Sequence, residues 1–110
     1  AYLAAYCASK HGLIGLTRSL AAEYAEKGVT VNSICPGYVE SSLLTGSIQN
    51  IVDKTGRDID EVRSELEARN PQRRFVDPSE VAAMCVFLAS ESARGVNGQA
   101  LTICGGEINM

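Results

Sequence analysis

The sequence contains no tryptophan, a single histidine and no pair of cysteines spaced as C-x-x-C. Its four cysteines, Cys7, Cys35, Cys85 and Cys104, are scattered, and only Cys7 stands near His11. Because zinc sites gather cysteine and histidine at short, fixed spacings, we expect no metal site. Cysteines scattered through apolar segments predict small buried residues with free thiols in a reducing compartment. Disulfide bonds between them are the less favoured alternative.

Long apolar runs and blocks of like charge are also missing. There is no stretch of 18 apolar residues and no signal peptide, and the formal net charge is only −3, without any basic run. These absences argue against a membrane or a nucleic acid as the main partner and predict a cytoplasmic protein. A composition with 45% hydrophobic and 5% aromatic residues suits a small α/β core.

A tyrosine and a lysine four residues apart, Tyr6 and Lys10, stand near the start of the first expected helix. They share one helical face, with Cβ atoms about 5–6 Å apart. A phenol exchanges protons poorly at neutral pH unless something stabilises its phenolate, and an ammonium at this distance is such a stabiliser. The spacing predicts an acid–base pair that works with a second positive charge or a hydrogen-bond donor, and an oxidised nicotinamide ring is such a partner. An exposed pair without function is the alternative.

The first helix is expected to continue to Lys27 and to stop at Gly28. Large apolar side chains recur every three or four residues and predict a buried stripe, which consists of Leu13, Leu16, Leu20 and Tyr24. A small-residue stripe beside it permits the close approach of another backbone, and it consists of Ala8, Gly12, Gly15, Ser19 and Ala22. The close neighbour is either the sheet or the same helix of a partner subunit.

Residues 29–35 are rich in β-branched residues and apolar at both ends, and they predict a parallel strand that ends at Pro36-Gly37. In an open α/β sheet, ligands bind beyond the carboxyl ends of the strands. The loop over residues 36–45 is therefore a candidate ligand site, with an ordinary strand-to-helix turn as the alternative.

The segment at about 41–70 is polar and predicted to be helical beyond the loop. Asp58 or Asp60 is expected to open a helix that ends at Asn70-Pro71, with a buried face that consists of Ile59, Val62 and Leu66. Such an insertion between a strand and the next helix is typical of a lid that excludes water from a substrate. A solvated helical hairpin is the equal alternative.

A further helix is predicted after Asp77, which serves as its N-cap with Pro78 at the first position and Glu80 completing a capping box. Its expected buried stripe consists of Val81, Met84, Cys85 and Leu88. Residues 100–104 then form a second short strand. Strands that alternate with helices predict a parallel sheet. Two strands leave unpaired edges, so we expect the chain to be part of a larger domain.

Four motifs in this order resemble the short-chain dehydrogenase/reductase family along nearly the whole chain. They are Tyr6-Cys7-Ala8-Ser9-Lys10 with the residues up to Thr17, then residues 31–37 (VNSICPG), 77–82 (DPSEVA) and 97–100 (NGQA). The resemblance implies a Rossmann-like, doubly wound parallel sheet, of which this chain is the C-terminal portion. It also implies an oxidoreductase that uses NAD or NADP to move a hydride between a ketone and a secondary alcohol.

The resemblance also implies roles for individual residues. Tyr6 matches the family's catalytic acid/base, and Lys10 matches the lysine that favours the ionised tyrosine and binds the nicotinamide ribose. The family's glycine-rich loop, catalytic serine and active-site asparagine have no counterpart here. Residues 1–110 are thus expected to be the C-terminal part of a single dinucleotide-binding domain without its N-terminal cofactor half, and to be inactive alone. The missing methionine before Ala1 agrees with this expectation.

The loop after the first strand matches the part of the family that lies beside the nicotinamide. Pro36, Gly37 and Val39 are its counterparts, and the Val39 backbone is expected to hold the carboxamide. Ser41 stands where the family usually has a threonine that contacts the cofactor. The helix that carries Tyr6 is a common dimer surface in the family, which favours a homo-oligomer, either a dimer or a tetramer.

Two departures bear on the substrate. Cys104-Gly105-Gly106 replaces the usual Asp-Gly-Gly and resembles some aromatic polyketide ketoreductases, whereas the acidic segment with interleaved arginines resembles members that act on 3-oxoacyl or 3-hydroxyacyl thioesters. Arg73 stands in place of a glycine. With Arg74 it either binds coenzyme A or an acyl carrier protein, or it is a solvated face with one internal ion pair. We expect a thioester substrate, with a polyketide ketone and a catalytically silent relative as alternatives.

Overall fold

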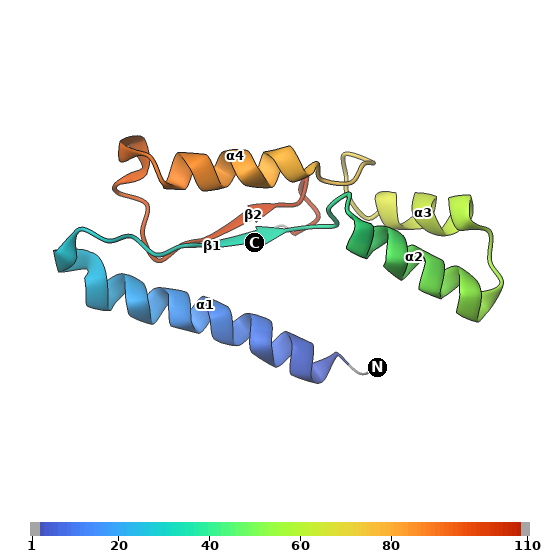
Figure 1. Ribbon diagram of the computed structural model, residues 1–110, viewed down its shortest axis with the longest axis horizontal. Helices are drawn as coiled ribbons and strands as arrows, with labels where there is room; N and C mark the ends of the chain where they lie inside the picture. Colours follow the sequence, from blue (N-terminus) through green and yellow to red (C-terminus); the bar gives the residue numbers. More distant parts are fainter. Residues whose placement is uncertain (1–2, 109–110) are drawn as a thin grey trace. The chain divides into compact units, whose positions relative to one another are not determined.

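The computed structural model describes residues 3–108 and divides into two compact units. The first unit contains the residues up to Ile34 together with Met84–Leu101, and the second contains Cys35–Ala83 and the residues from Thr102 onward. The expected order of helices and strands is confirmed (Figure 1). The elements are α1 (Ala4–Tyr24), η1 (Ala25–Lys27), β1 (Ser33–Pro36), α2 (Ser42–Thr55), α3 (Ile59–Glu67), α4 (Pro78–Leu88), η2 (Glu91–Ala93) and β2 (Ala100–Ile103).

Helix α1 and the 3₁₀ turn η1 extend to Lys27, as predicted. Gly28 ends them in a left-handed conformation with φ of 74°, and its N–H donates to the carbonyl of Ala25. Glycine adopts this conformation without steric penalty, which is why it is the common terminator of helices.

Helix α1 packs within the first unit through two short side chains, Thr17 and Ala21. The Thr17 hydroxyl lies 2.6 Å from that of Ser33 at the start of β1. A Cβ atom on Gly98 would lie 3.3 Å from Ala21 Cβ, and Gly98 has φ of 70°. The backbone conformation at position 98 therefore favours glycine, and a larger side chain there would also crowd the helix.

The predicted buried stripe of α1 is wrong. Leu13, Leu16 and Tyr24 are exposed, and Leu20 is only half-buried. The small-residue stripe is exposed as well, and a Cβ on Gly12 or Gly15 would meet no atom within 4 Å. The physical reason is that α1 turns the face between Thr17 and Ala21 toward β1 and the Gly98 turn, so neither predicted stripe is covered by the described part of its unit.

The first strand is shorter than predicted, because residues 29–32 lie opposite a turn and not opposite a strand. The Val31 N–H donates to Oδ1 of Asn97 at 2.9 Å. Asn32 donates from its side chain to the carbonyl of Val96 at 2.8 Å and accepts from the N–H of Gln99 at 3.0 Å. The side-chain amides of the two asparagines thus bond to backbone N–H and carbonyl groups that would pair with a neighbouring strand in a regular sheet.

Strands β1 and β2 form a parallel pair, as predicted. The N–H of Ser33 donates to the carbonyl of Gln99 at 2.8 Å, and the N–H of Gly37 donates to that of Ile103 at 2.9 Å. Four residues along one strand correspond to four along the other in the same direction, which is the parallel register.

Helices α2 and α3 lie side by side within the second unit (Figure 1). Asp58 caps α3 as expected, and its carboxylate accepts from the N–H groups of Asp60 and Glu61. The loop predicted to reach Thr45 is wrong, because Ser41 caps α2 and Ser42 already begins it. The shared core consists of Leu44, Ile48, Val62 and Phe75, with Ile51, Val52 and Leu66 packed against it, whereas Ile59 is exposed.

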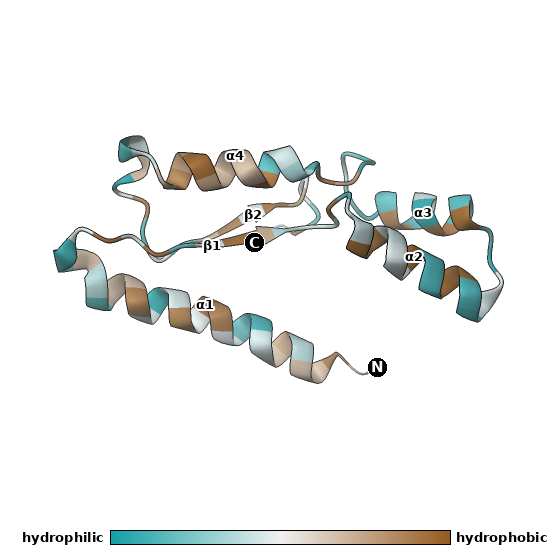
Figure 2. Ribbon diagram, in the orientation of Figure 1, coloured by the Kyte–Doolittle hydropathy of each residue, from teal (hydrophilic) through white to brown (hydrophobic). Residues whose placement is uncertain are grey.

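The capping box of α4 is confirmed. Asp77 accepts from the N–H of Ser79 at 2.8 Å, and the Glu80 carboxylate accepts from the N–H of Asp77 at 2.7 Å. The predicted burial of this helix is wrong, since Val81, Met84 and Leu88 are half-buried and Cys85 is exposed. Figure 2 shows apolar residues along much of α4, and Val86 and Phe87 are exposed.

The cysteines also differ from the expectation of burial. Cys7 and Cys85 are exposed, Cys35 is half-buried and Cys104 is buried. All four are free thiols. Among residues 3–108, no helix is long and apolar enough to cross a membrane.

Candidate active site

The Tyr6 and Lys10 side chains lie together on one face of α1. The Lys10 ammonium is 5.4 Å from the centre of the Tyr6 ring, as the four-residue spacing predicts. Both side chains are exposed, with 60% of the Tyr6 surface accessible. Within residues 3–108, neither the phenol hydroxyl nor the ammonium makes a hydrogen bond. Both groups are thus free to bind a ligand's oxygen atoms.

The backbone of α1 fixes the position of this pair. The N–H of Cys7 donates to the carbonyl of Leu3 at 2.8 Å, and the hydroxyl of Ser9 donates to the carbonyl of Tyr6 at 2.7 Å. His11 similarly bonds the carbonyl of Cys7 at 2.8 Å, so its ring is engaged by its own helix. The polar residues around the pair therefore secure the helix and leave its tyrosine and lysine as the available groups.

The four predicted loop residues, Pro36, Gly37, Val39 and Ser41, lie together in the second unit. Pro36 ends β1, and Gly37 follows it. A Cβ on Gly37 would lie 3.4 Å from Cys104 and 3.3 Å from Oε2 of Glu107. Such contacts are tight, so glycine lets the chain pass close to the end of β2.

Val39 has both of its backbone polar groups available. It forms an isolated parallel bridge with Val76, whose N–H donates to the carbonyl of Tyr38 at 2.8 Å and whose carbonyl accepts from the N–H of Glu40 at 2.9 Å. In a parallel bridge, these bonds flank the central residue, whose own N–H and carbonyl point the other way. Neither group of Val39 has a partner in the part of the chain that the structure describes. A donor and an acceptor side by side match a carboxamide.

Ser41 has a structural role that was not predicted. Its Oγ accepts from the N–H of Leu44 at 3.2 Å and caps α2. A serine hydroxyl has one hydrogen to donate and a second lone pair. The predicted contact with a cofactor therefore remains compatible with the cap.

Two arginines that were not predicted as site residues reach this loop, Arg63 of α3 and Arg69, which follows that helix. Arg63 binds both carboxylate oxygens of Glu40, one of them at 3.2 Å. Arg69 donates to the hydroxyl of Tyr38 at 3.2 Å, and its guanidinium lies 5.9 Å from the centre of that ring. The partners are 23 positions apart in the first contact and 31 in the second, so no local sequence pattern predicts either contact.

The neighbouring arginines Arg73 and Arg74 differ in their contacts, since only Arg74 forms an ion pair among the described residues. Arg74 binds Glu80 through two bonds of 2.6 and 2.8 Å. This bond, followed by the N–H of Asp77, lowers the pKa of Glu80 from its ordinary value of 4.5 to about 2. Arg73 is exposed and has φ of 57°, a left-handed conformation that favours glycine. The internal ion pair is therefore confirmed.

The chain after β2 makes a close turn around Cys104. Gly105 and Gly106 have φ of 61° and 93°, and a Cβ on Gly105 would lie 2.0 Å from Oδ1 of the buried Asn70. No other residue fits there. The N–H groups of Ile108 and then Gly106 hold the pKa of the Cys104 thiol below its usual value. The turn thus stabilises negative charge on a buried sulfur.

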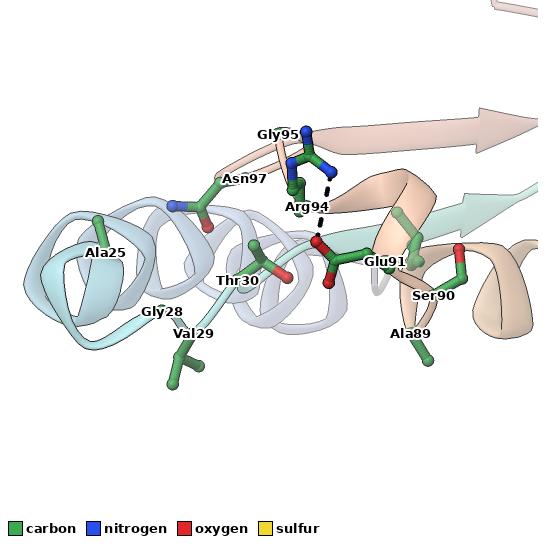
Figure 3. Close-up of a pocket in the computed structure, with 11 residues that line it drawn as sticks. Ala25, Gly28, Val29, Thr30, Ala89, Ser90, Glu91, Arg94, Gly95 and Asn97 are labelled. Carbon is green, nitrogen blue, oxygen red and sulfur yellow. Dashed lines mark hydrogen bonds and ion pairs between the residues drawn. The ribbon is translucent and has the colours of Figure 1, made fainter.

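The first unit also has a surface hollow, shown in Figure 3, between residues 25–30 and the segment from Leu88 to Asn97. Its two charged groups, Glu91 and Arg94, pair with one another at 3.3 Å. It contains none of the predicted site residues. The candidate functional residues therefore form two separate groups, Tyr6 with Lys10 in the first unit and the loop from Pro36 to Ser41 in the second.

Comparison with known proteins agrees with the motifs along the chain. A protein-family model described as enoyl-(acyl carrier protein) reductase matches residues 1–107. A Streptomyces coelicolor protein named as a ketoacyl reductase is 41% identical over 105 residues, which are 96% of this chain and 40% of that protein. A D-beta-hydroxybutyrate dehydrogenase of Cupriavidus necator is 41% identical over 103 residues, 93% of this chain and 40% of the relative.

Solved structures give the same result for the fold. A variant of the actinorhodin polyketide ketoreductase, solved with NADPH, matches with a TM-score of 0.88 and 41% identity. The match covers 96% of this chain and 40% of that one. The α/β fold with a parallel, Rossmann-like sheet is therefore confirmed, and the chain spans about 40% of the length of the relatives that it matches.

Proposed function

The chain belongs to the short-chain dehydrogenase/reductase family, and from this premise we propose that the whole protein is an NAD- or NADP-dependent oxidoreductase. It moves a hydride between the nicotinamide cofactor and the carbonyl carbon of a ketone, which becomes a secondary alcohol. The observation that carries this proposal is the pairing of Tyr6 and Lys10 on one face of α1, with the Lys10 ammonium 5.4 Å from the ring.

Tyr6 is the proton donor and acceptor of this reaction. In reduction its hydroxyl gives a proton to the carbonyl oxygen while the carbonyl carbon receives the hydride, and in oxidation the phenolate takes the alcohol proton. Lys10 stabilises the phenolate by its positive charge and donates to a ribose hydroxyl. Both groups have the accessibility and the free hydrogen-bonding capacity that these roles require.

The cofactor is NAD or NADP, and its nicotinamide supplies or accepts the hydride. The residues of the second unit fit this group, because the N–H and the carbonyl of Val39 are both available to a carboxamide. Pro36 and Gly37 bring the chain to that point, and the hydroxyl of Ser41 has a free hydrogen for the cofactor. A solved relative that contains NADPH supports the assignment.

The preferred substrate is a 3-oxoacyl or 3-hydroxyacyl thioester, held under residues 41–70 as a lid. Relatives named as a ketoacyl reductase and a D-beta-hydroxybutyrate dehydrogenase support a substrate with oxygen at its third carbon. An aromatic polyketide ketone is the second candidate, favoured by Cys104-Gly105-Gly106 and by 41% identity to the actinorhodin ketoreductase.

The test of this proposal compares two ketones with the purified full-length protein. Oxidation of NADPH and of NADH is followed by absorbance with an acetoacetyl thioester and with a bulky bicyclic ketone. Faster turnover of the thioester supports the preferred substrate, and faster turnover of the bicyclic ketone supports the second candidate. No oxidation of either cofactor with either ketone would contradict the proposed activity and favour a silent relative.

The whole protein is further proposed to be a cytoplasmic homo-oligomer, either a dimer or a tetramer. The exposed small-residue stripe of α1 supports a subunit contact, because nothing within 4 Å would meet a Cβ on Gly12 or Gly15. A second α1 helix can approach such a surface closely.

A further inference from the structure

The loop that contains Val39 is held by two sets of contacts within the second unit. Val76 binds the backbone of Tyr38 and Glu40. Arg63 binds both oxygens of the Glu40 carboxylate. The Arg63 guanidinium also lies 4.9 Å from the centre of the buried Phe75 ring, next to Val76 in the chain.

These contacts restrict the peptide on either side of Val39. The Glu40 N–H is fixed at 2.9 Å from the Val76 carbonyl, and the Glu40 side chain is fixed by two bonds to one rigid guanidinium. Bidentate pairing sets orientation as well as distance, which a single ion contact does not. The direction of the free Val39 N–H and carbonyl thus depends on a pair that contacts neither group.

We propose that Arg63 is a positioning residue, which acts through Glu40 to hold the Val39 backbone in the orientation that binds the nicotinamide carboxamide. The inference rests on the proposed function, because the carboxamide is the group that Val39 would bind. Arg63 belongs to α3, so a helix of the proposed lid sets the geometry of the cofactor loop.

Because Arg63 and Glu40 are partly exposed, their effect on the loop can be measured apart from the stability of the whole fold. The side chains of Arg63 and Glu40 are 38% and 47% accessible. Ion pairs at this exposure contribute little to the stability of a whole protein. Loss of Arg63 should therefore leave the fold intact and loosen one loop.

The chain offers a matched control for this effect. Arg63 has a second carboxylate partner, Glu67, at 3.3 Å within α3. Glu67→Gln removes that partner and leaves the bonds to Glu40, whereas Glu40→Gln and Arg63→Gln each remove the contact with the loop. All three variants exchange a charged side chain for a neutral one on the same surface.

The first measurement is amide hydrogen exchange at Glu40 and Val76 in the cofactor-free full-length protein. Arg63→Gln and Glu40→Gln should each speed exchange by about three- to tenfold, the range of a partly exposed bidentate pair. The double variant should equal either single variant, because the two residues act as one pair. Glu67→Gln should leave the exchange rates unchanged.

The second measurement is the Kd of NADP(H) and NAD(H) by fluorescence titration. Arg63→Gln should weaken binding by about three- to tenfold, with kcat within twofold of the wild type and Tm unchanged, and Arg63→Lys should recover part of the affinity. Unchanged exchange or unchanged Kd in Arg63→Gln, or an equal loss in Glu67→Gln, would overturn the positioning role while normal turnover upholds the proposed function. A wild-type protein that binds neither nucleotide would overturn both.

Discussion

The ammonium of Lys10 lies 5.4 Å from the centre of the Tyr6 ring, one turn further along the same face of α1. No hydrogen bond joins the two groups in residues 3–108, so neither group competes with a ligand for the other. The arrangement also leaves both polar ends accessible, since neither makes a hydrogen bond within residues 3–108. The proposed proton transfer by Tyr6 requires a hydroxyl that is accessible in this way.

Replacement of Lys10 by alanine should impair both roles proposed for this residue, which are the stabilisation of the Tyr6 phenolate and the binding of the cofactor's ribose. Turnover of the full-length protein should fall by about tenfold or more, because the phenolate of Tyr6 loses its stabilising charge. The Kd of the nicotinamide cofactor should rise as well, because a ribose contact is lost. Steady-state kinetics and fluorescence titration measure the two effects, and Lys10→Arg, which keeps the charge, serves as the control. Normal cofactor affinity in Lys10→Ala would contradict the ribose contact.

A large side chain in the exposed small-residue stripe should separate the subunits. Gly15→Leu should give monomers in sedimentation velocity, because the leucine prevents the close approach of a second α1 helix. Leucine favours a helix more than glycine does, so unfolding of α1 is not the expected cause. Gly15→Ala tests the same position with a small side chain and should preserve the oligomer. Oligomers that persist in Gly15→Leu would place the subunit contact elsewhere.

The Arg74–Glu80 pair should make the start of α4 sensitive to acid. The pKa of Glu80 is lowered from 4.5 to about 2, so the folded state binds this proton less readily than the unfolded chain. Its stabilising contribution is therefore complete above pH 4.5 and is lost as the pH falls toward about 2.

Arg74→Gln tests this relation directly. The substitution should raise the pKa of Glu80 toward 4.5, though not fully, because the Asp77 N–H still donates to its carboxylate. A carboxyl titration by NMR measures the pKa, and thermal unfolding should differ more between variant and wild type at neutral pH than near pH 2. An unchanged Glu80 titration in Arg74→Gln would show that the ion pair is not the cause.

Sequence-based prediction succeeded where neighbouring residues decide the structure. Asp58 and Asp77 cap helices by bonds to residues two or three positions away, and Gly28 ends a helix through its own backbone conformation. The Tyr6–Lys10 geometry follows from helical spacing in the same way. Such features need no knowledge of the rest of the fold.

The prediction failed where residues far apart in the sequence determine the packing and the hydrogen bonds. The residues that pack α1, Thr17 and Ala21, are a polar and a small side chain, which hydropathy does not mark as core. Residues 29–32 have strand-like composition but bind the amide side chain of Asn97 and the turn beside it. The contact of Arg63 with Glu40 depends on how α3 lies against the loop, which no spacing in the chain encodes.

The most direct test of the account is the turnover of Tyr6→Phe in the full-length protein, measured beside its cofactor Kd. The phenylalanine keeps the ring and removes only the hydroxyl that transfers the proton. We expect turnover to fall by about 10²- to 10⁴-fold, the usual contribution of an acid–base group, with a cofactor Kd close to that of the wild type. Undiminished turnover in Tyr6→Phe would contradict the role of Tyr6 and, with it, the proposed reaction at this site.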